Sequence, residues 1–222
     1  MKTIQTLFST IEQIQTIKVV KTFQSKKHTV SFITINKKPF VLKWYQPGFK
    51  KNMLCEYQIL SNSSINFAKP IVFEKNEKYQ FLLLEYIKGT NLCDILNMNE
   101  IQLDEKIHII HLLAHWFAQF HQHFQTEKET LLHGDAHIRN FLYANKIFGL
   151  DFEETHPGLP IEDLADVSAS ILTTNPQFTK EKKQLQQQFI QYYEHLTNKK
   201  IQNSDLAVKK AIKKTVKRRK QK

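Results

Sequence analysis

The stretch LLHGDAHIRNFLYANKIFGLDFEE, residues 131–154, contains three polar residues whose spacing predicts a local fold. Asp135 lies five residues before Asn140, and Asp151 lies eleven residues after Asn140. Between Asn140 and Asp151, two apolar runs flank the polar turn 144–146, a pattern that predicts a tight β-hairpin. Such a hairpin would bring Asn140 and Asp151 together at its open end.

These residue types suit the transfer of a phosphoryl group from ATP. Catalysis of that reaction consists mostly of positioning and charge neutralisation. Asp135 would position and deprotonate an acceptor hydroxyl. The Asn140 amide oxygen and the Asp151 carboxylate would share a divalent cation, Mg²⁺ or Mn²⁺, because such cations prefer oxygen ligands. The sequence therefore predicts Asp135 as the catalytic base and Asn140 and Asp151 as metal ligands.

The same stretch resembles the catalytic core of the protein-kinase-like superfamily, in which H-R-D-x-x-x-x-N is followed by D-F-G. Residues 133–140 read HGDAHIRN, and residues 151–153 read DFE. Gly134 and Glu153, at positions where protein kinases have Arg and Gly, resemble the aminoglycoside phosphotransferase and choline kinase branch. The resemblance implies an α+β, two-lobed fold with a small antiparallel β-rich N-lobe and a mainly helical C-lobe. It also implies an ATP- and Mg-dependent kinase that phosphorylates a hydroxyl of a small molecule.

The resemblance predicts an ion pair upstream that grips the nucleotide phosphates. The segment 38–45, KPFVLKWY, has the pattern of a strand carrying a phosphate-binding lysine, Lys43. Thirteen residues later, Glu56 lies in a segment with helical spacing of apolar residues, 52–60. Lys43 would hold the α- and β-phosphates, and Glu56 would orient it. Taken singly, each also suits an exposed side chain.

Two further nucleotide contacts are predicted in the N-lobe. An apolar strand ending at Glu85, Tyr86 and Ile87 resembles the hinge that binds adenine through its backbone. The phosphate-covering turn, QSKKHT at 24–29, has no glycine, although kinases usually place glycines there to let the backbone approach the phosphates. Ser25 and Lys26 would supply donors and charge instead. The glycine-free turn also leaves open a kinase-like binding module with little catalysis.

Three sets of polar residues are expected in the C-lobe. The resemblance makes His133 a buried scaffold residue that bonds backbone near the catalytic loop. In IEDLAD, residues 161–166, Asp163 fits the position that braces this loop, with Asp166 as the alternative. Three histidines share one face of a predicted long helix over 104–124, where a metal site competes with ordinary exposed histidines; they are His108, His111 and His115.

Bulk properties favour a single kinase-like domain spanning residues 1–222. A chain of 222 residues with 41% hydrophobic content can bury a full core, and no linker-like segment divides it. We expect an N-lobe over 1–86, a C-lobe over 87–207 and a basic helix or tail over 208–222. No apolar run approaches the roughly 18 residues of a membrane span, so a cytoplasmic protein is expected.

The positive charge is concentrated at the C-terminus. Nine of the 32 Lys and Arg residues lie between Val208 and Lys222, and without them the formal net charge of +11 falls to +2. Apolar residues within this segment follow helical spacing, which predicts a helix docked by one side with its basic face in water. The basic face suits a solvated surface, contact with RNA or another polyanion, or an anionic membrane surface.

This tail adds a second, weaker resemblance, to the small tRNA-modification kinase of the KEOPS assembly. That kinase has a similar length, H-G-D and a basic C-terminus, but its L-T-T-S-N, D-F-G and glycine-containing loop are absent here. An atypical protein kinase or ATPase associated with RNA is therefore the alternative function. Residues 155–196 hold no acidic cluster beyond Glu162, Asp163 and Asp166, so a strongly cationic aminoglycoside is not the favoured acceptor.

Overall fold

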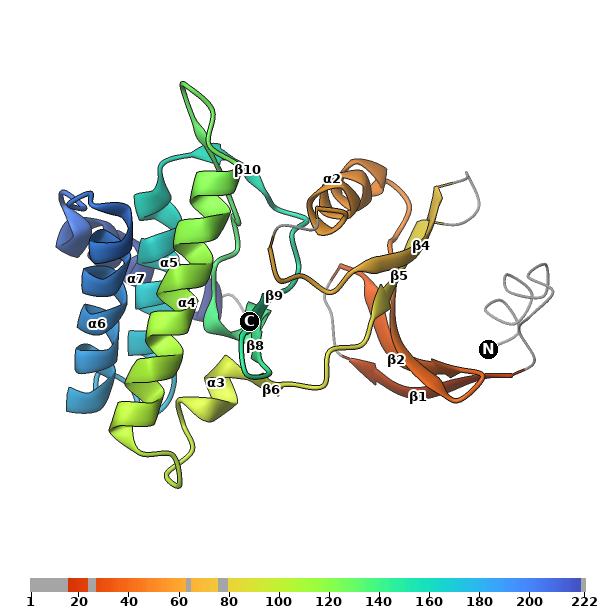
Figure 1. Ribbon diagram of the computed structural model, residues 1–222, viewed down its shortest axis with the longest axis horizontal. Coiled ribbons are helices and arrows are strands. Elements are labelled where there is room, and N and C mark those ends of the chain that lie inside the picture. Colours follow the sequence, from red (N-terminus) through yellow and green to blue (C-terminus); the bar gives the residue numbers. More distant parts are fainter. Residues whose placement is uncertain (1–15, 24–26, 63–64, 76–79, 221–222) are drawn as a thin grey trace. The chain divides into compact units, whose positions relative to one another are not determined.

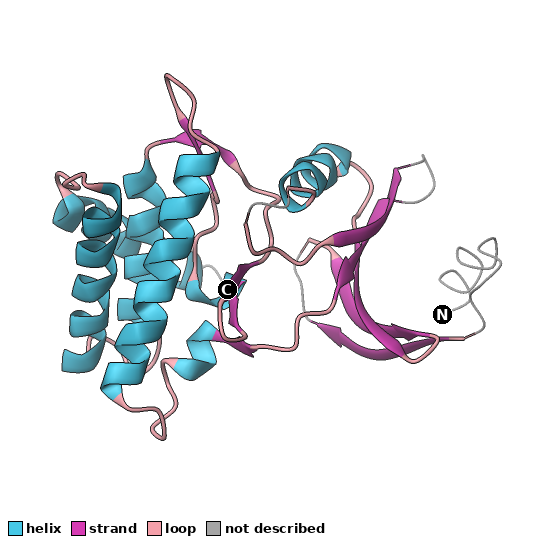
Figure 2. Ribbon diagram, viewed as in Figure 1, coloured by secondary structure: helices cyan, strands magenta, loops and turns pink. Residues whose placement is uncertain are grey.

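The computed structural model describes residues 16–23, 27–62, 65–75 and 80–220. The chain divides into two compact units (Figure 1). The first comprises the described residues within 1–62 and 68–87, and the second those within 63–67 and 88–222. Strands predominate in the first unit and helices in the second (Figure 2). Residues 65–67 belong with the second unit, although the sequence analysis expects them in the N-lobe.

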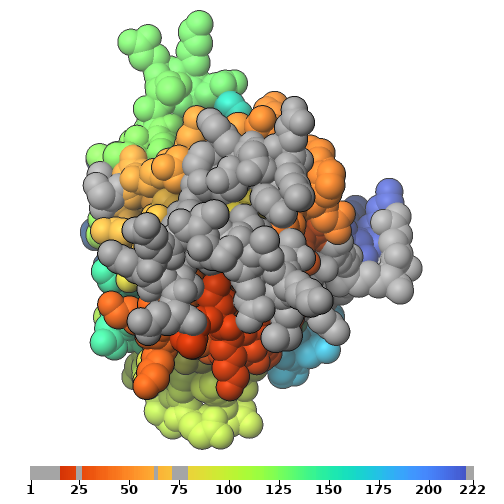
Figure 3. All heavy atoms as spheres, turned by 90° about the vertical axis from the view of Figure 1, so that its right-hand side faces the viewer, coloured from red at the N-terminus to blue at the C-terminus, as the bar shows by residue number. Residues whose placement is uncertain are grey.

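The first unit is built on an antiparallel sheet with the strand order β1-β2-β3-β5-β4. Its strands are β1 (Ile17–Phe23), β2 (Thr29–Ile35), β3 (Lys38–Trp44), β4 (Pro70–Lys75) and β5 (Gln80–Glu85). Asn36 and Lys37 connect β2 to β3 with φ of 49° and 67°, the left-handed pair that a type I′ hairpin turn requires. The edge strand β1 is largely exposed, and its atoms are seen in red in Figure 3.

Alternation of side chains gives this sheet two apolar faces. One face carries a core cluster of Ile33, Ile35, Leu42, Phe81 and Leu83. The intervening residues point the other way, toward the face with which helix α2 (Lys50–Leu60) is in contact. Lys43 is on that second face, opposite Leu82 in the register of β3 and β5.

The second unit contains a group of helices preceded by short strands. Helix α4 (Leu103–His123) packs on α6 (Lys180–Thr197), and α5 (Pro160–Thr173) packs on both α6 and α7 (Ser204–Lys220). The short helix α3 (Leu92–Ile95) begins after Asn91, whose side chain accepts a hydrogen bond from the backbone N–H of Cys93 and caps the helix.

The predicted catalytic hairpin is present. It consists of β8 (Phe141–Tyr143) and β9 (Ile147–Gly149), with β6 (Thr90–Asn91) beside β8. Asn145 adopts a φ of 60° in the turn. The hairpin and Phe152 are anchored by the fully buried Trp116 of α4, whose ring contacts those of Phe141 and Phe152. A core of aromatic rings therefore holds the ends of the catalytic segment.

Helix α7 is docked by one side, as its apolar spacing predicts. Val208 and Ala211 are buried against Ala165, Ala169 and Leu172 of α5. The helix begins at Ser204, four residues before the predicted tail. A second short sheet pairs β7 (Thr130–Leu132) with β10 (His156–Gly158) at the two ends of the catalytic segment.

Candidate active site

Asp135 and Asn140 are joined directly within the catalytic loop. The amide nitrogen of Asn140 donates to the backbone oxygen of Asp135 at 2.9 Å and to its carboxylate Oδ2 at 3.2 Å. A 3₁₀ turn, Ile138–Asn140, bends the chain between them and brings the Asn140 side chain back to Asp135. Because the amide nitrogen is held by Asp135, the amide oxygen is the Asn140 atom with the orientation and chemistry of a metal ligand.

The hairpin returns the chain to Asn140, as predicted. Phe141 pairs with Gly149, and the backbone N–H of Leu150 donates to the Asn140 carbonyl at 2.9 Å. Asp151 follows immediately and has a φ of 63°, in the left-handed region that aspartate tolerates better than most residues. The backbones of the two predicted metal ligands therefore meet at the open end of the hairpin.

The backbone conformation at position 134 and the close approach of neighbouring atoms require a glycine, Gly134, there. Its φ is +81°, and a Cβ atom at this position would lie 2.0 Å from the carbonyl oxygen of Glu154. Any side chain would displace the turn at Glu154, which follows the D-F-E segment. This explains in physical terms why the chain has glycine where protein kinases have arginine.

Asp163, rather than Asp166, braces the catalytic loop. Its Oδ2 accepts the backbone N–H of His133 at 2.7 Å, and its Oδ1 accepts that of Gly134 at 3.1 Å. Only 2% of Asp163 is exposed. A buried carboxylate thus fixes the two peptide groups immediately before Asp135.

Sequence reasoning missed the support behind Asp163. His121 of α4 is buried and lies with its Nε2 3.1 Å from Asp163 Oδ2 and its Nδ1 3.0 Å from the Tyr193 hydroxyl. Burial alone would raise the pKa of Asp163, but the hydrogen bond and charge of His121, with further help from His133, lower it. Only tertiary packing brings these distant residues together, so no local pattern could have indicated them.

His133 has the scaffold position expected of it. The residue is fully buried, and its Nε2 lies 3.0 Å from the carbonyl oxygen of Leu150. This contact connects the start of the catalytic loop to the end of the hairpin. Within the part of the chain that the structure describes, Nδ1 of His133 has no hydrogen-bond partner.

In the first unit, Lys43 and Glu56 form the ion pair that the sequence predicts. Nζ of Lys43 lies 2.7 Å from Oε2 of Glu56, and the two side chains are 8% and 2% exposed. The Tyr45 hydroxyl donates to the same carboxylate oxygen, a partner that the sequence analysis did not identify. Glu56 therefore orients a buried ammonium group that would be costly to leave unpaired.

The other predicted nucleotide contacts are only partly described. Glu85 ends β5, and its backbone N–H donates to the Lys69 carbonyl at 2.9 Å. Tyr86 stacks on Phe32 with a centroid distance of 4.6 Å, and Ile87 is the last residue of the first unit. Ser25 and Lys26 lie outside the described residues.

The three histidines on α4 do not form a metal site among the described residues. None of His108, His111 and His115 belongs to a group of three or more possible ligands placed to share an ion. His111 instead stacks on Tyr192 at a centroid distance of 4.0 Å and contacts Gln188.

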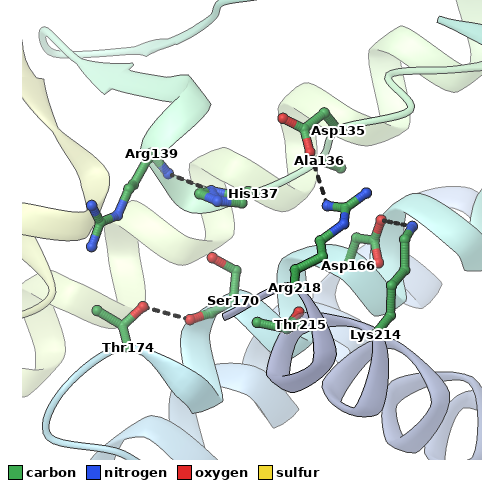
Figure 4. Close-up of a pocket in the computed structure, with 10 residues that line it drawn as sticks. All are labelled: Asp135, Ala136, His137, Arg139, Asp166, Ser170, Thr174, Lys214, Thr215 and Arg218. Atoms are coloured by element: carbon green, nitrogen blue, oxygen red, sulfur yellow. Dashed lines mark hydrogen bonds and ion pairs between the residues drawn. The ribbon is translucent and has the colours of Figure 1, made fainter. Parts of the chain in front are cut away.

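A polar cavity of about 230 Å³ opens beside Asp135, entirely within the second unit. Residues of the catalytic loop, α5 and α7 line it (Figure 4), namely Asp135, Ala136, His137, Arg139, Asp166, Ser170, Thr174, Lys214, Thr215 and Arg218. Arg218 points from α7 toward Asp135, with 3.6 Å between guanidinium and carboxylate. Lys214 lies 3.2 Å from Asp166.

Two titratable groups of the cavity have shifted pKa values. Burial lowers the pKa of His137, and this effect outweighs the opposing influence of Asp135. Burial raises the pKa of Asp166, although Lys214 opposes the shift. The sequence predicts that the basic face of α7 lies in water, but two of its cations, Lys214 and Arg218, instead approach acids of the catalytic region.

Family comparison supports this assignment of the second unit. Residues 93–199 match the phosphotransferase enzyme family, and this segment, just under half of the chain, includes Asp135, Asn140, Asp151 and Asp163. No curated protein sequence matches the chain significantly.

The structure resembles solved aminoglycoside phosphotransferases at low sequence identity. One from Ralstonia eutropha JMP134 gives a TM-score of 0.67 at 11% identity, with 93% of this chain and 83% of that chain covered. A mutant of aminoglycoside 2′-phosphotransferase-IIIa, solved as a GDP complex, gives a TM-score of 0.65 at 13% identity, covering 95% and 84%. A thermostable mutant of APH(4)-Ia, solved with ADP and hygromycin B, gives 0.60 at 12%, covering 94% and 87%.

The fold is that of the protein-kinase-like superfamily. The resemblance to the aminoglycoside phosphotransferase branch and the two-lobed α+β fold class are confirmed. The family match also confirms the predicted enzyme class, a kinase-type phosphotransferase. No described helix is both long and apolar enough to cross a membrane.

Proposed function

We propose that this phosphotransferase moves the γ-phosphoryl group of ATP to a hydroxyl of a small molecule. The observation that carries the proposal is the catalytic loop, in which Asn140 is hydrogen-bonded to Asp135 while the hairpin returns Asp151 beside Asn140. A base, an amide oxygen and a second carboxylate are thereby supplied by a single short segment.

The donor set fits a divalent cation. Asn140 and Asp151 offer oxygen atoms only, which is the ligand type that Mg²⁺ and Mn²⁺ prefer. The hydrogen bonds from the Asn140 amide nitrogen to Asp135 leave the amide oxygen for the metal. Bound there, the metal would neutralise phosphate charge during transfer.

The residues of the chain divide the remaining tasks. Asp135 accepts the proton of the acceptor hydroxyl and aligns its oxygen with the γ-phosphorus. Asp163 holds the backbone just before Asp135, and this fixes the position from which the Asp135 side chain extends. Lys43, oriented by Glu56, is assigned to the α- and β-phosphates. In this scheme the protein acts by positioning and electrostatics, as phosphoryl transfer requires.

The alternatives carry less support. Nothing in the comparisons favours an RNA-associated kinase, and the approach of Lys214 and Arg218 to acidic partners draws two tail cations away from the face that RNA would use. A binding module with little catalysis would still be expected to bind nucleotide, but not to turn it over.

Nucleotide competence can be tested before any acceptor is known. Thermal shifts should be measured with ATP, ADP and GTP, each with and without Mg²⁺ or Mn²⁺, for the native chain and for Asp151→Asn. We expect stabilisation by nucleotide with a metal-dependent part, because binding to the folded state alone stabilises it. Asp151→Asn should lose that part, and equally tight binding of Mg·ATP by both proteins would show that the metal site is misassigned.

A further inference from the structure

We propose that the acceptor is an anionic alcohol, a small molecule that carries a phosphate or carboxylate group close to the hydroxyl being phosphorylated. This inference rests on the proposed function and assigns its acceptor site to the cavity beside Asp135. The cavity, of about 230 Å³, suits a small polar molecule or one end of a larger one.

The charge of the cavity favours an anion. Its lining contains three cations, Arg139, Lys214 and Arg218, against the two acids Asp135 and Asp166. With Asp166 paired to Lys214, the lining has an excess of one positive charge, because Arg139 and Arg218 stand against the single carboxylate of Asp135.

Arg218 is placed to bind the acid group of the acceptor. Its guanidinium lies 3.6 Å from the Asp135 carboxylate, longer than the roughly 2.7–2.9 Å of a charge-assisted hydrogen bond. Its side chain is 58% exposed, so the contact with Asp135 is weak and readily exchanged for a ligand. A guanidinium also binds phosphate or carboxylate through two parallel N–H donors, a geometry that lysine lacks.

The short distance between Arg218 and Asp135 limits the size of the acceptor. A molecule whose hydroxyl contacts Asp135 and whose acid group contacts Arg218 must separate these groups by only a few bonds. Phosphorylated polyols and short hydroxy acids meet this condition. Polycationic acceptors do not, since their ammonium groups would be repelled by Arg218 and Lys214 over distances shorter than the Debye length of about 8 Å.

The inference departs from what the structural neighbours would suggest. APH(4)-Ia was solved with hygromycin B, an aminoglycoside, whereas the cavity of this chain has cations on the wall contributed by α7. The basic C-terminal helix would thus contribute to substrate selection.

Binding by the full-length chain tests this directly. Mg·ADP binding is measured first by calorimetry. Four probes then follow at saturating Mg·ADP: glycerol 3-phosphate, glycerate, neutral glycerol and cationic hygromycin B. We expect the two anions to bind more tightly than glycerol, with hygromycin B weakest, and affinity for both anions to fall as salt increases.

Matched charge variants assign the effect to the cavity. Lys214→Gln with Arg218→Gln should weaken glycerol 3-phosphate binding roughly tenfold to hundredfold, since each lost charge-assisted contact is worth about a factor of ten. Lys213→Gln with Lys217→Gln removes the same charge from exposed positions of α7 outside the cavity, and should change binding less than twofold. A double variant that has Arg218→Lys in place of Arg218→Gln, with Lys214→Gln retained, should recover part of the lost affinity for glycerol 3-phosphate.

The outcomes separate the two proposals. A protein that shows no metal-dependent binding of ADP lacks the proposed function, and this inference falls with it. A protein that binds Mg·ADP but prefers glycerol or hygromycin B, or binds no anion, overturns the anionic acceptor alone. Equal losses in the two double variants would also overturn it, because the effect would then come from overall charge.

Discussion

Asp163→Asn should destabilise the protein substantially, and the structure indicates by how much. The carboxylate accepts three hydrogen bonds, from the backbone N–H groups of His133 and Gly134 and from the His121 ring. An amide in its place keeps one acceptor oxygen and directs an NH₂ group at a buried donor. One unsatisfied buried donor costs about 1–3 kcal/mol, and the weakened charge-assisted bonds add to it. We expect a loss of about 2–4 kcal/mol at pH 7.

The pH dependence of this loss has a defined sign. In the folded protein the pKa of Asp163 lies below the ordinary 3.8, because the interactions with His121 and His133 outweigh the opposing effect of burial. A depressed pKa in the folded state contributes stability that is fully present above the unfolded pKa and is lost as pH falls. The difference between native chain and Asp163→Asn should therefore shrink below about pH 4.

Asp166 provides a matched control three residues along the same helix. Burial raises its pKa despite Lys214, so its ionised form is disfavoured in the folded state. Asp166→Asn should therefore remove a destabilising contribution, which develops as pH rises above 3.8 and persists at pH 7. Urea denaturation followed by circular dichroism at pH 7 and pH 3.5 measures all three proteins. A loss at pH 7 no larger for Asp163→Asn than for Asp166→Asn would refute the bracing role.

Two further predictions concern residues that act in pairs. Lys43→Met and Glu56→Gln should each weaken ATP binding, and the double variant should cost less than the sum, because residues in direct contact are non-additive; strict additivity in calorimetry would contradict the pairing. Gly134→Ala should lower both stability and turnover, because its Cβ would meet the Glu154 carbonyl; a variant with native melting temperature and activity would contradict this close approach.

Local patterns predicted much of the fold. The hairpin after Asn140 follows from two apolar runs around a polar turn, and helix α7 follows from the spacing of Val208, Ala211 and their neighbours. Each of these signals lies within a few residues along the chain, which is why the sequence reveals it.

Contacts between distant segments were not predictable in the same way. His121 meets Asp163 across 42 residues, and Arg218 approaches Asp135 from the far end of the chain. The tail was recognisable as a basic helix, but its apolar side alone does not determine which cations lie beside the catalytic loop. Packing of α7 on α5 decides that, through Ala165 and Ala169.

Phosphorus NMR of the full-length protein with Mg·ATP and a pool of small hydroxyl compounds tests the central claim most directly. The account predicts loss of the γ-phosphorus signal, formation of ADP and appearance of a phosphomonoester. Asp135→Ala should still bind Mg·ATP but turn over about 10²–10⁴-fold more slowly, the usual size of a general-base effect. A phosphomonoester formed at the native rate by Asp135→Ala, or none formed by the native protein despite tight Mg·ATP binding, would contradict the account.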